Sequence, residues 1–252
     1  MNALVRAISA ETVKLRGTLA LWMCLIAPAV VVGLYALQLT FMKVAARDVD
    51  PADAWRGFAM SVMGLWAFLM LPLFITLQSA LLAGLEHGER QWKHLLALPM
   101  PPASHYLAKA VALVAMIAAA FIVLVLLTPV GGWIVSLTQP AFGIAGPPPW
   151  ALMWRSVAAM FAASLLVAAL HTWISIRWRS FTVAVSIGMT ATVMGFLIGQ
   201  SARFGHWYPW SMPLQVLAGE GKHLDFVVMA GLAGGLVVTL LGLVNFSRRD
   251  VD

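Results

Sequence analysis

Few residues of this chain have the type and spacing that chemistry requires. His171 is the one titratable side chain well inside a long hydrophobic run, where it can be either a proton relay or a hydrogen-bonded packing residue. His87 and His94 are seven residues apart among charged side chains, whereas metal ligands must converge on one point at a helical spacing such as i, i+4. The sequence also lacks a nucleophile elbow and a His-Glu-x-x-His pair. It therefore predicts no catalytic and no metal-binding residue.

The acidic residues and glycines also exclude two kinds of energy coupling within this chain. All 10 acidic residues lie in loops, tails or at the ends of hydrophobic runs, whereas coupled carriers usually need intramembrane carboxylates, although unwound backbone can also bind ions. The only Gly-Lys pair, Gly221-Lys222, lacks the upstream glycine of a Walker A loop. We therefore expect no cofactor in this chain, and any ATP and Mg to be bound by a partner subunit.

The most informative polar segment is 86–102. As a helix, it gathers its apolar side chains on one side and its charged side chains on the other, and Pro99 ends it. Such a helix at the membrane surface can pass force between a soluble partner and the membrane helices; an ordinary solvated loop is the alternative. The residues expected to form this coupling site are Glu86, Glu89, Arg90, Trp92, Lys93, Leu95, Leu96 and Pro99.

The elements that position these residues follow from composition. Of the 252 residues, 62% are hydrophobic and only 10% are charged, whereas a soluble domain is about half apolar and about a quarter charged. An apolar run of about 20 residues spans a bilayer. The sequence therefore predicts an all-α integral membrane protein, with a single transmembrane domain over 1–252 and six transmembrane helices. The expected spans are 19–42, 57–85, 107–130, 151–176, 180–201 and 224–246.

Two of these spans carry signals of irregularity. Pro72 predicts a kink in the second span. The third span is expected to end near Thr128-Pro129 or Gly131-Gly132, because proline and glycine both disfavour a continuing helix.

Two further segments have membrane character without spanning. Residues 1–18 form an amphipathic helix, with Val5, Ile8, Thr12 and Leu15 on one face, that suits the membrane interface; a cytosolic extension of the first span is the alternative. Segment 204–222 is too apolar for a free external loop and is interrupted by prolines, so we expect short re-entrant helices in the outer leaflet. Such backbone must be buried in protein or line a watery cavity.

The basic residues set the expected orientation. The net charge is +6, but the Lys and Arg residues flank the hydrophobic runs, which indicates membrane topology and lipid contact rather than nucleic acid. Ten of the 16 lie on the N-terminal side of the membrane and six on the other. This bias predicts a multi-pass protein of the inner (plasma) membrane with both termini in the cytoplasm; the reverse topology is the alternative.

Four short motifs, in this order along the whole chain, carry a family resemblance. The chain resembles the permease subunits of type-2 ATP-binding-cassette (ABC) exporters, and within them the bacitracin- and lantibiotic-resistance branch. Each motif is loose, and their order and spacing carry the resemblance. The motifs are Glu11-Thr-Val-Lys14-Leu-Arg-Gly-Thr; the Glu86 loop with Trp92, Leu95-Leu96, Leu98-Pro99, Tyr106 and Lys109; Arg177-Trp-Arg-Ser-Phe181; and Phe246-Ser-Arg-Arg-Asp250.

This resemblance implies a partnership and a function. It implies a dimer with a second permease, identical or homologous, and two copies of an ABC ATPase subunit docked on segment 86–102 as the coupling helix. It also implies a non-catalytic permease that exports an amphipathic or hydrophobic substrate, such as a peptide antibiotic, drug or lipid. The alternatives are a membrane scaffold or assembly subunit of a metallocentre-maturation or sensor complex, and a membrane-embedded enzyme.

Overall fold

The computed structural model describes residues 3–42, 50–88, 101–178, 180–218 and 221–248, with side chains left out for 85–88. Within these ranges all regular structure is helical. Six helices are long and apolar enough to cross a membrane. The predicted all-α membrane fold with six candidate spans is therefore confirmed.

The first half of the chain forms the longest helices. The short helix α1 precedes α2, and α3 continues through a π-helical turn, η1, into α4. Helix α6 has 37 residues, and at 1.5 Å per residue it is about 55 Å long, well beyond the roughly 30 Å of a hydrocarbon core. The bounds are α1 Ala3–Leu15, α2 Leu19–Phe41, α3 Pro51–Leu65, η1 Trp66–Met70, α4 Leu71–Gly88 and α6 Pro102–Thr138.

The second half holds three longer helices and a compact connection. Helix α8 is joined to α10 by a segment that contains the single-turn helix α9, and α10 continues through a second π-helical turn, η4, into α11. The bounds are η2 Pro140–Phe142 (a 3-10 turn), α7 Trp150–Arg177, α8 Phe181–Gly199, α9 Met212–Gln215, α10 Leu224–Met229, η4 Ala230–Gly234 and α11 Gly235–Ser247.

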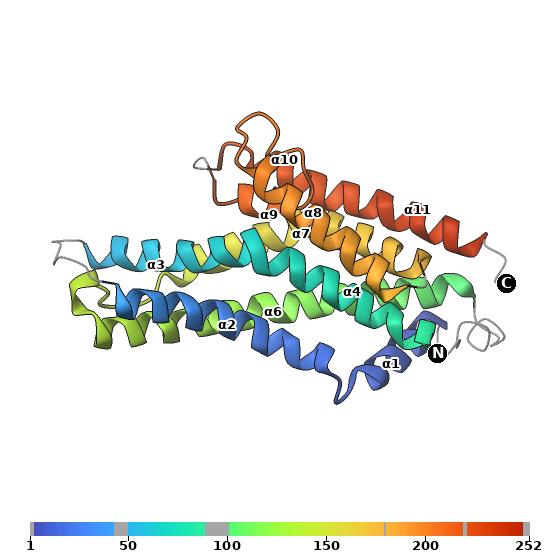
Figure 1. The fold of residues 1–252 in the computed structure, drawn as a ribbon, viewed down its shortest axis with the longest axis horizontal. Coiled ribbons are helices and arrows are strands. Elements are labelled where there is room, and N and C mark those ends of the chain that lie inside the picture. The colour runs from blue at the N-terminus through green and yellow to red at the C-terminus, as the bar shows by residue number, and fades with distance from the viewer. Residues whose placement is uncertain (1–2, 43–49, 89–100, 179, 219–220, 249–252) are drawn as a thin grey trace.

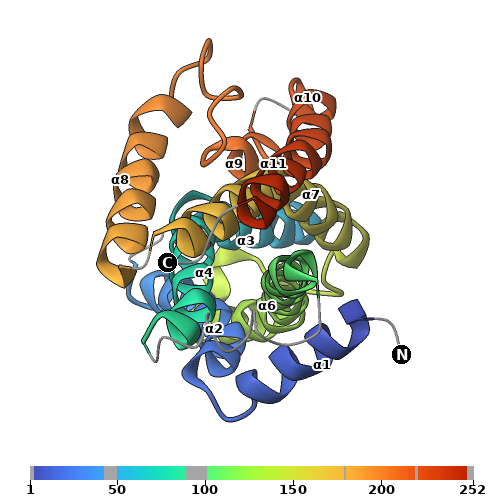
Figure 2. The same cartoon turned by 90° about the vertical axis from the view of Figure 1, so that its right-hand side faces the viewer.

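The helices form an elongated bundle around α7, which packs against α3, α4, α6, α8, α9, α10 and α11. Helix α1 and the last turn of α11 lie at one end of this bundle, here called the α1 end, and the end of α2 and the start of α3 lie at the opposite, far end (Figure 1). Helix α1 runs across the α1 end rather than along the bundle (Figure 2). This placement is the one expected of a helix that lies flat at a membrane surface.

Two helices extend beyond the spans expected from hydropathy. Helix α3 starts at Pro51 because the Asp50 carboxylate accepts a hydrogen bond from the Ala52 N–H at 2.9 Å. Asp at the N-cap followed by Pro is a strong start signal. Helix α6 starts at Pro102 and continues to Thr138. The ends of a helix and the borders of the membrane are separate quantities, and hydropathy addresses only the second.

The glycines of α6 serve close packing instead of termination. A Cβ on Gly131 would lie 2.5 Å from Val32 Cγ1, and one on Gly132 would overlap the ring of Trp55. Trp55 is 1% exposed, and its indole N–H donates to the Gly146 carbonyl at 3.2 Å. Glycine at these positions therefore lets α2 and α3 approach α6 closely.

The irregularity expected at Pro72 lies in the turn before it. The π-helical turn Trp66–Met70 directly precedes Pro72, which lacks the N–H that would bond back to the carbonyl of Phe68. A wider turn accommodates the ring without ending the helix. The α3–α4 unit thus crosses the bundle as one continuous rod.

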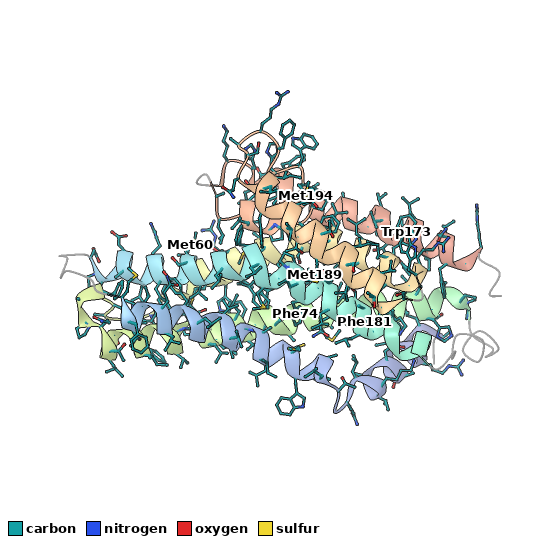
Figure 3. All side chains as sticks on the ribbon, in the orientation of Figure 1. Met60, Phe74, Trp173, Phe181, Met189 and Met194 are labelled. Atoms are coloured by element: carbon teal, nitrogen blue, oxygen red, sulfur yellow. The ribbon has the colours of Figure 1, made fainter. Side chains whose placement is uncertain are left out.

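Large apolar side chains cover the outside of the bundle. Met189 and Met194 on α8 (Figure 3) are 53% and 43% exposed. Soluble monomers rarely show apolar surface over a large contiguous area. Lipid or another membrane subunit must cover these faces. The other side chains of this kind on α2, α8 and α11 include Leu34, Leu37, Val193, Leu197, Leu236 and Leu240.

Substitution of Gly132 by Ala tests the close packing of α6. We expect Gly132→Ala to lower stability by about 1–3 kcal/mol, because the new methyl group overlaps a Trp55 ring that cannot move away. The midpoint of thermal unfolding in detergent measures this change. Gly33→Ala is the matched control, because a Cβ there meets nothing within 4 Å. Equal midpoints for the two variants would contradict the packing role.

Candidate functional site

The predicted coupling residues fall mostly outside the described part of the chain. Glu89, Arg90, Trp92, Lys93, Leu95, Leu96 and Pro99 all lie there. Glu86 belongs to the last turns of α4, but its side chain is not among those described. The structure does define the two helix ends that hold segment 86–102, since α4 ends at Gly88 and α6 begins at Pro102.

A buried ammonium group joins these two helix ends to α1. Lys109 Nζ on α6 donates to the Leu82 carbonyl on α4 at 2.8 Å and to Glu11 Oε2 on α1 at 3.2 Å. The Lys109 and Glu11 side chains are 3% and 6% exposed. One side chain therefore connects the helix before segment 86–102, the helix after it and the N-terminal helix.

Glu11 holds a second cation at the edge of this site. Lys14 Nζ lies 2.9 Å from Glu11 Oε1, and its side chain is 28% exposed. The carboxylate is thus shared between one buried and one peripheral ammonium group. A buried ion pair recovers its desolvation cost only when both partners keep good geometry and further hydrogen bonds. The site therefore constrains the positions of α1, α4 and α6 relative to one another.

The same contact explains which face of α1 turns inward. The buried residues of α1 are Ala7, Glu11 and Leu15, at a spacing of four. The apolar face predicted for the membrane interface includes Val5 and Thr12, and both are exposed, Val5 at 51%, so they are not part of the face that packs inward. Glu11 is drawn inward by its partner on α6, which the pattern of α1 alone does not contain.

A small cavity adjoins Lys109. Its volume is about 10 Å³, which is about the space that one water molecule needs. Ser79, Thr172 and Lys109 supply its polar lining, and the apolar side chains of Leu82, Ala83, Leu113 and Ile176 complete it.

A second contact cluster at the α1 end fastens the last helix. The Trp173 indole N–H on α7 donates to Asn245 Oδ1 on α11 at 3.3 Å. The Tyr106 ring lies 6.0 Å from the Phe246 ring, centroid to centroid, and the Tyr106 hydroxyl packs directly on Gly242. The position of Trp173 toward the α1 end is visible in Figure 3. Residues from three separate sequence motifs, namely Glu11, Lys109 with Tyr106, and Phe246, thus gather at one end of the bundle.

These contacts connect helices to one another. In the described part of the chain no group of three or more His, Cys, Asp or Glu side chains could hold a metal ion. The geometry defines a class of protein: a multi-pass helical membrane protein whose polar contacts tie together the two helix ends of a surface segment.

Comparison with known families agrees with this class. The family model described as ABC-2 family transporter protein matches residues 7–195. The chain therefore belongs to the ABC-2 transporter family, whose members are membrane permeases of ABC transporters. The match runs from α1 into α8 and so includes Glu11, segment 86–102 and Lys109. A search of curated proteins finds no match.

The Glu11–Lys109 pair can be tested by a double-mutant cycle. We expect Glu11→Gln and Lys109→Met each to lower the free energy of unfolding, by up to about 3–5 kcal/mol, because each removes one partner of a buried charge pair. The variant with both substitutions should lose less than the sum, since the partners are coupled. Chemical denaturation in detergent measures all three variants.

Lys14→Met supplies the control for this cycle. It removes the more exposed cation, and such pairs contribute about 0–1 kcal/mol. Additive losses in the double variant, or a Lys14→Met effect as large as that of Lys109→Met, would contradict the assignment of Lys109 as the joint.

Proposed function

We propose that this chain is the permease subunit of an ATP-driven ABC exporter whose substrate is amphipathic or hydrophobic, such as a peptide antibiotic, drug or lipid. Family membership supports the permease role. The observation that carries the proposal is the Lys109 contact, because it joins both ends of segment 86–102 to α1. A push on that segment would therefore reach three helices at once.

In this proposal the α1 end faces the cytoplasm of the inner membrane. The excess of Lys and Arg on that side supports this orientation. Segment 204–222 then lies on the outer side as a re-entrant element. Support comes from its burial, since Ser211 and Met212 are each only 3% exposed among the helices. Backbone at membrane depth has to be covered by protein in this way.

The proposed assembly contains two copies of an ABC ATPase subunit, which bind ATP and Mg, and a second permease, identical or homologous. Segment 86–102 is the proposed docking element, with Glu86, Glu89, Arg90 and Lys93 toward the ATPase and Trp92, Leu95, Leu96 and Pro99 shaping its membrane side. The exposed apolar faces of α2, α8 and α11 offer surface for lipid and for the second permease. A path between two copies suits an amphipathic cargo better than a charged one. We place the chain in the bacitracin- and lantibiotic-resistance branch on the order of its motifs.

Charge reversal in segment 86–102 tests the docking. Glu86→Lys, Glu89→Lys and Arg90→Glu together replace attraction by repulsion at the proposed ATPase surface. We expect an affinity-tagged chain carrying them to lose most of the ATPase activity that the wild-type chain captures from its native membranes. Insertion should be unchanged, because the substitutions leave the apolar runs intact.

A charge-matched control distinguishes docking from general electrostatics. Arg47→Glu, Asp48→Lys and Asp53→Lys change the same charges before α3 and in its first turn, which the proposal places outside, and they spare Asp50, which caps α3. This variant should retain the captured ATPase. If it loses the ATPase while the Glu86 variant keeps it, the docking assignment is wrong.

A separate prediction concerns ATP itself. The chain purified free of other proteins should hydrolyse no ATP, because it has no glycine loop to hold the phosphates. Phosphate release measures this. Hydrolysis that stays with the chain after chaotropic removal of peripheral subunits would rule out a non-catalytic permease.

A further inference from the structure

His171 lies at a junction of three elements inside the bundle. It sits on α7 and is 0% exposed. The Trp210 indole N–H, from the segment between α8 and α10, donates to His171 Nε2 at 3.2 Å, and the two rings meet edge to face at 5.7 Å. The Thr76 hydroxyl on α4 lies 3.3 Å from the same nitrogen. An indole N–H only donates, so Nε2 is the acceptor and the neutral ring carries its proton on Nδ1.

The segment that carries Trp210 is hydrogen-bonded to α8, and its helix α9 also packs against α7. Tyr208 donates its hydroxyl proton to the Ala191 carbonyl at 2.9 Å, and Gln215 Nε2 donates to the Gly199 carbonyl at 2.9 Å. Gly199 also lies against Ser211, where a Cβ would come within 3.1 Å. Among the hydrogen bonds of the described residues, the Trp210–His171 bond is the one that ties this segment to α7. We call α8 together with residues 201–218 the α8 unit.

The α8 unit stands to one side of the bundle. Figure 2 shows α8 apart from α10 and α11, with α9 between them. Helix α8 packs mainly on α4, and Gly188 is the point of closest approach, because a Cβ there would overlap Thr76 and come within 2.6 Å of His171 Cε1. Phe196 stacks on Phe68 at 4.3 Å. Among the described residues, the unit thus has one side-chain hydrogen bond to the rest of the bundle, at His171. Around it lies a mainly apolar contact surface, which includes α9 on α7 and Trp207 on Phe226 of α10.

Polar contacts continue from His171 toward the α1 end. The Ser79 hydroxyl donates to the Thr76 carbonyl at 3.0 Å, and the Ser175 hydroxyl donates to Ser79 Oγ at 3.1 Å. Ser79 also lines the small cavity that reaches Lys109. A row of polar contacts between α4 and α7, here called the α4–α7 polar row, therefore runs from Trp210 to Ser79, which shares the small cavity with Lys109 of the Glu11–Lys109 pair.

In the closed arrangement, with the Trp210–His171 bond made, the other ring nitrogen of His171 is unpaired. His171 Nδ1, which carries the proton, is buried and has no hydrogen-bond partner among the residues that the structure describes. An unpaired buried donor weakens the state that contains it. The free-energy cost of the unpaired Nδ1–H partly cancels the gain from the Trp210 bond at Nε2. The closed arrangement and an open one without that bond are therefore closer in free energy than the Trp210 bond alone would make them.

We propose that the Trp210–His171 hydrogen bond is a latch that holds the α8 unit against α4 and α7. We also propose that the α4–α7 polar row, with the cavity beside Lys109, links this latch to the Glu11–Lys109 pair. Release of the bond lets the α8 unit move away from the core. A change in Glu11–Lys109 geometry alters how often release occurs. The latch itself does not depend on the proposed function. Only the idea that an ATPase docked on segment 86–102 drives the change at Glu11–Lys109 rests on it.

A cysteine on the inner face of α8 reports the opening. Thr192 is 2% exposed, and its hydroxyl bonds only within its own helix, to the Gly188 carbonyl at 2.8 Å. Thr192→Cys therefore removes no contact between helices through that hydroxyl. The rate at which a small, water-soluble methanethiosulfonate modifies this cysteine is proportional to the open fraction. Cys24, the only native cysteine, is buried on α2 and reports unfolding of the same molecule. Peptide mass spectrometry separates the two sites.

Trp210→Phe keeps an aromatic ring and removes the donor. We expect it to raise the Thr192→Cys modification rate about five- to tenfold, the effect of losing roughly one hydrogen bond. His171→Phe should act similarly, and the double variant no more than either alone. Trp207→Phe is the matched control, because Trp207 is 62% exposed and contacts His206 and Phe226 instead. Equal rates for Trp210→Phe and Trp207→Phe, or additive effects in the double variant, would overturn the latch.

The link to the α1 end is tested with the same reporter. Glu11→Gln, and separately Ser175→Ala within the α4–α7 polar row, should each change the modification rate at least twofold while Cys24 stays protected. Trp173→Phe removes a hydrogen bond at the α1 end that does not belong to the α4–α7 polar row. This variant should leave the modification rate unchanged. If only Trp210→Phe and His171→Phe alter the rate, the link is wrong. The assay uses the chain in membranes without ATP or a partner, so loss of the ATPase partnership would not affect its outcome.

Discussion

A charged ammonium group inside an apolar bundle must keep its partners, because removing either partner leaves a charge that the surroundings cannot solvate. Lys109 is such a group, and its partners come from α1 and α4. The turn between α1 and α2, the end of α4 and the start of α6 therefore have only one relative arrangement in which all of these contacts are made. Much of the geometry at the α1 end follows from this constraint, including the face of α1 that turns inward and the separation of the two ends of segment 86–102.

The class of fold could be predicted because it depends on a sum over many residues. Runs of about 20 apolar side chains are visible without knowledge of any contact. The bounds of individual helices depend on single residues instead. Asp50 extends α3 by capping it, and Gly131 and Gly132 let α6 pass close to Val32 and Trp55 rather than ending it. Glycine has the same appearance in a sequence whether it ends a helix or fits under a tryptophan ring, and only the neighbouring helix decides between the two.

Only some residues of the candidate site can be predicted from the sequence. Glu11 and Lys109 were singled out as motif residues, but their pairing is separated by 98 positions and no local pattern contains it. His171 was recognised as an unusual group in a span, and its partner Trp210 was not, because tryptophan in a proline-rich connection signals an interface position. The coupling residues of segment 86–102 remain a prediction from amphipathic pattern and resemblance.

The location of the polar contacts bears on how such a bundle changes state. Apolar side chains pack against lipid almost as favourably as against another helix, so apolar contact alone holds helices in a membrane with little preference for one arrangement. Hydrogen bonds and ion pairs are directional, and each one made or lost distinguishes one arrangement from another. In this protein the polar contacts of α4 and α7 run from Trp210 to Ser79, beside the cavity that Lys109 also lines, while the outward faces of α2, α8 and α11 are apolar. The apolar faces can slide or exchange neighbours at small cost. The α4–α7 polar row is directional and cannot slide in this way, so a rearrangement of this bundle that separates α4 from α7 would have to break it.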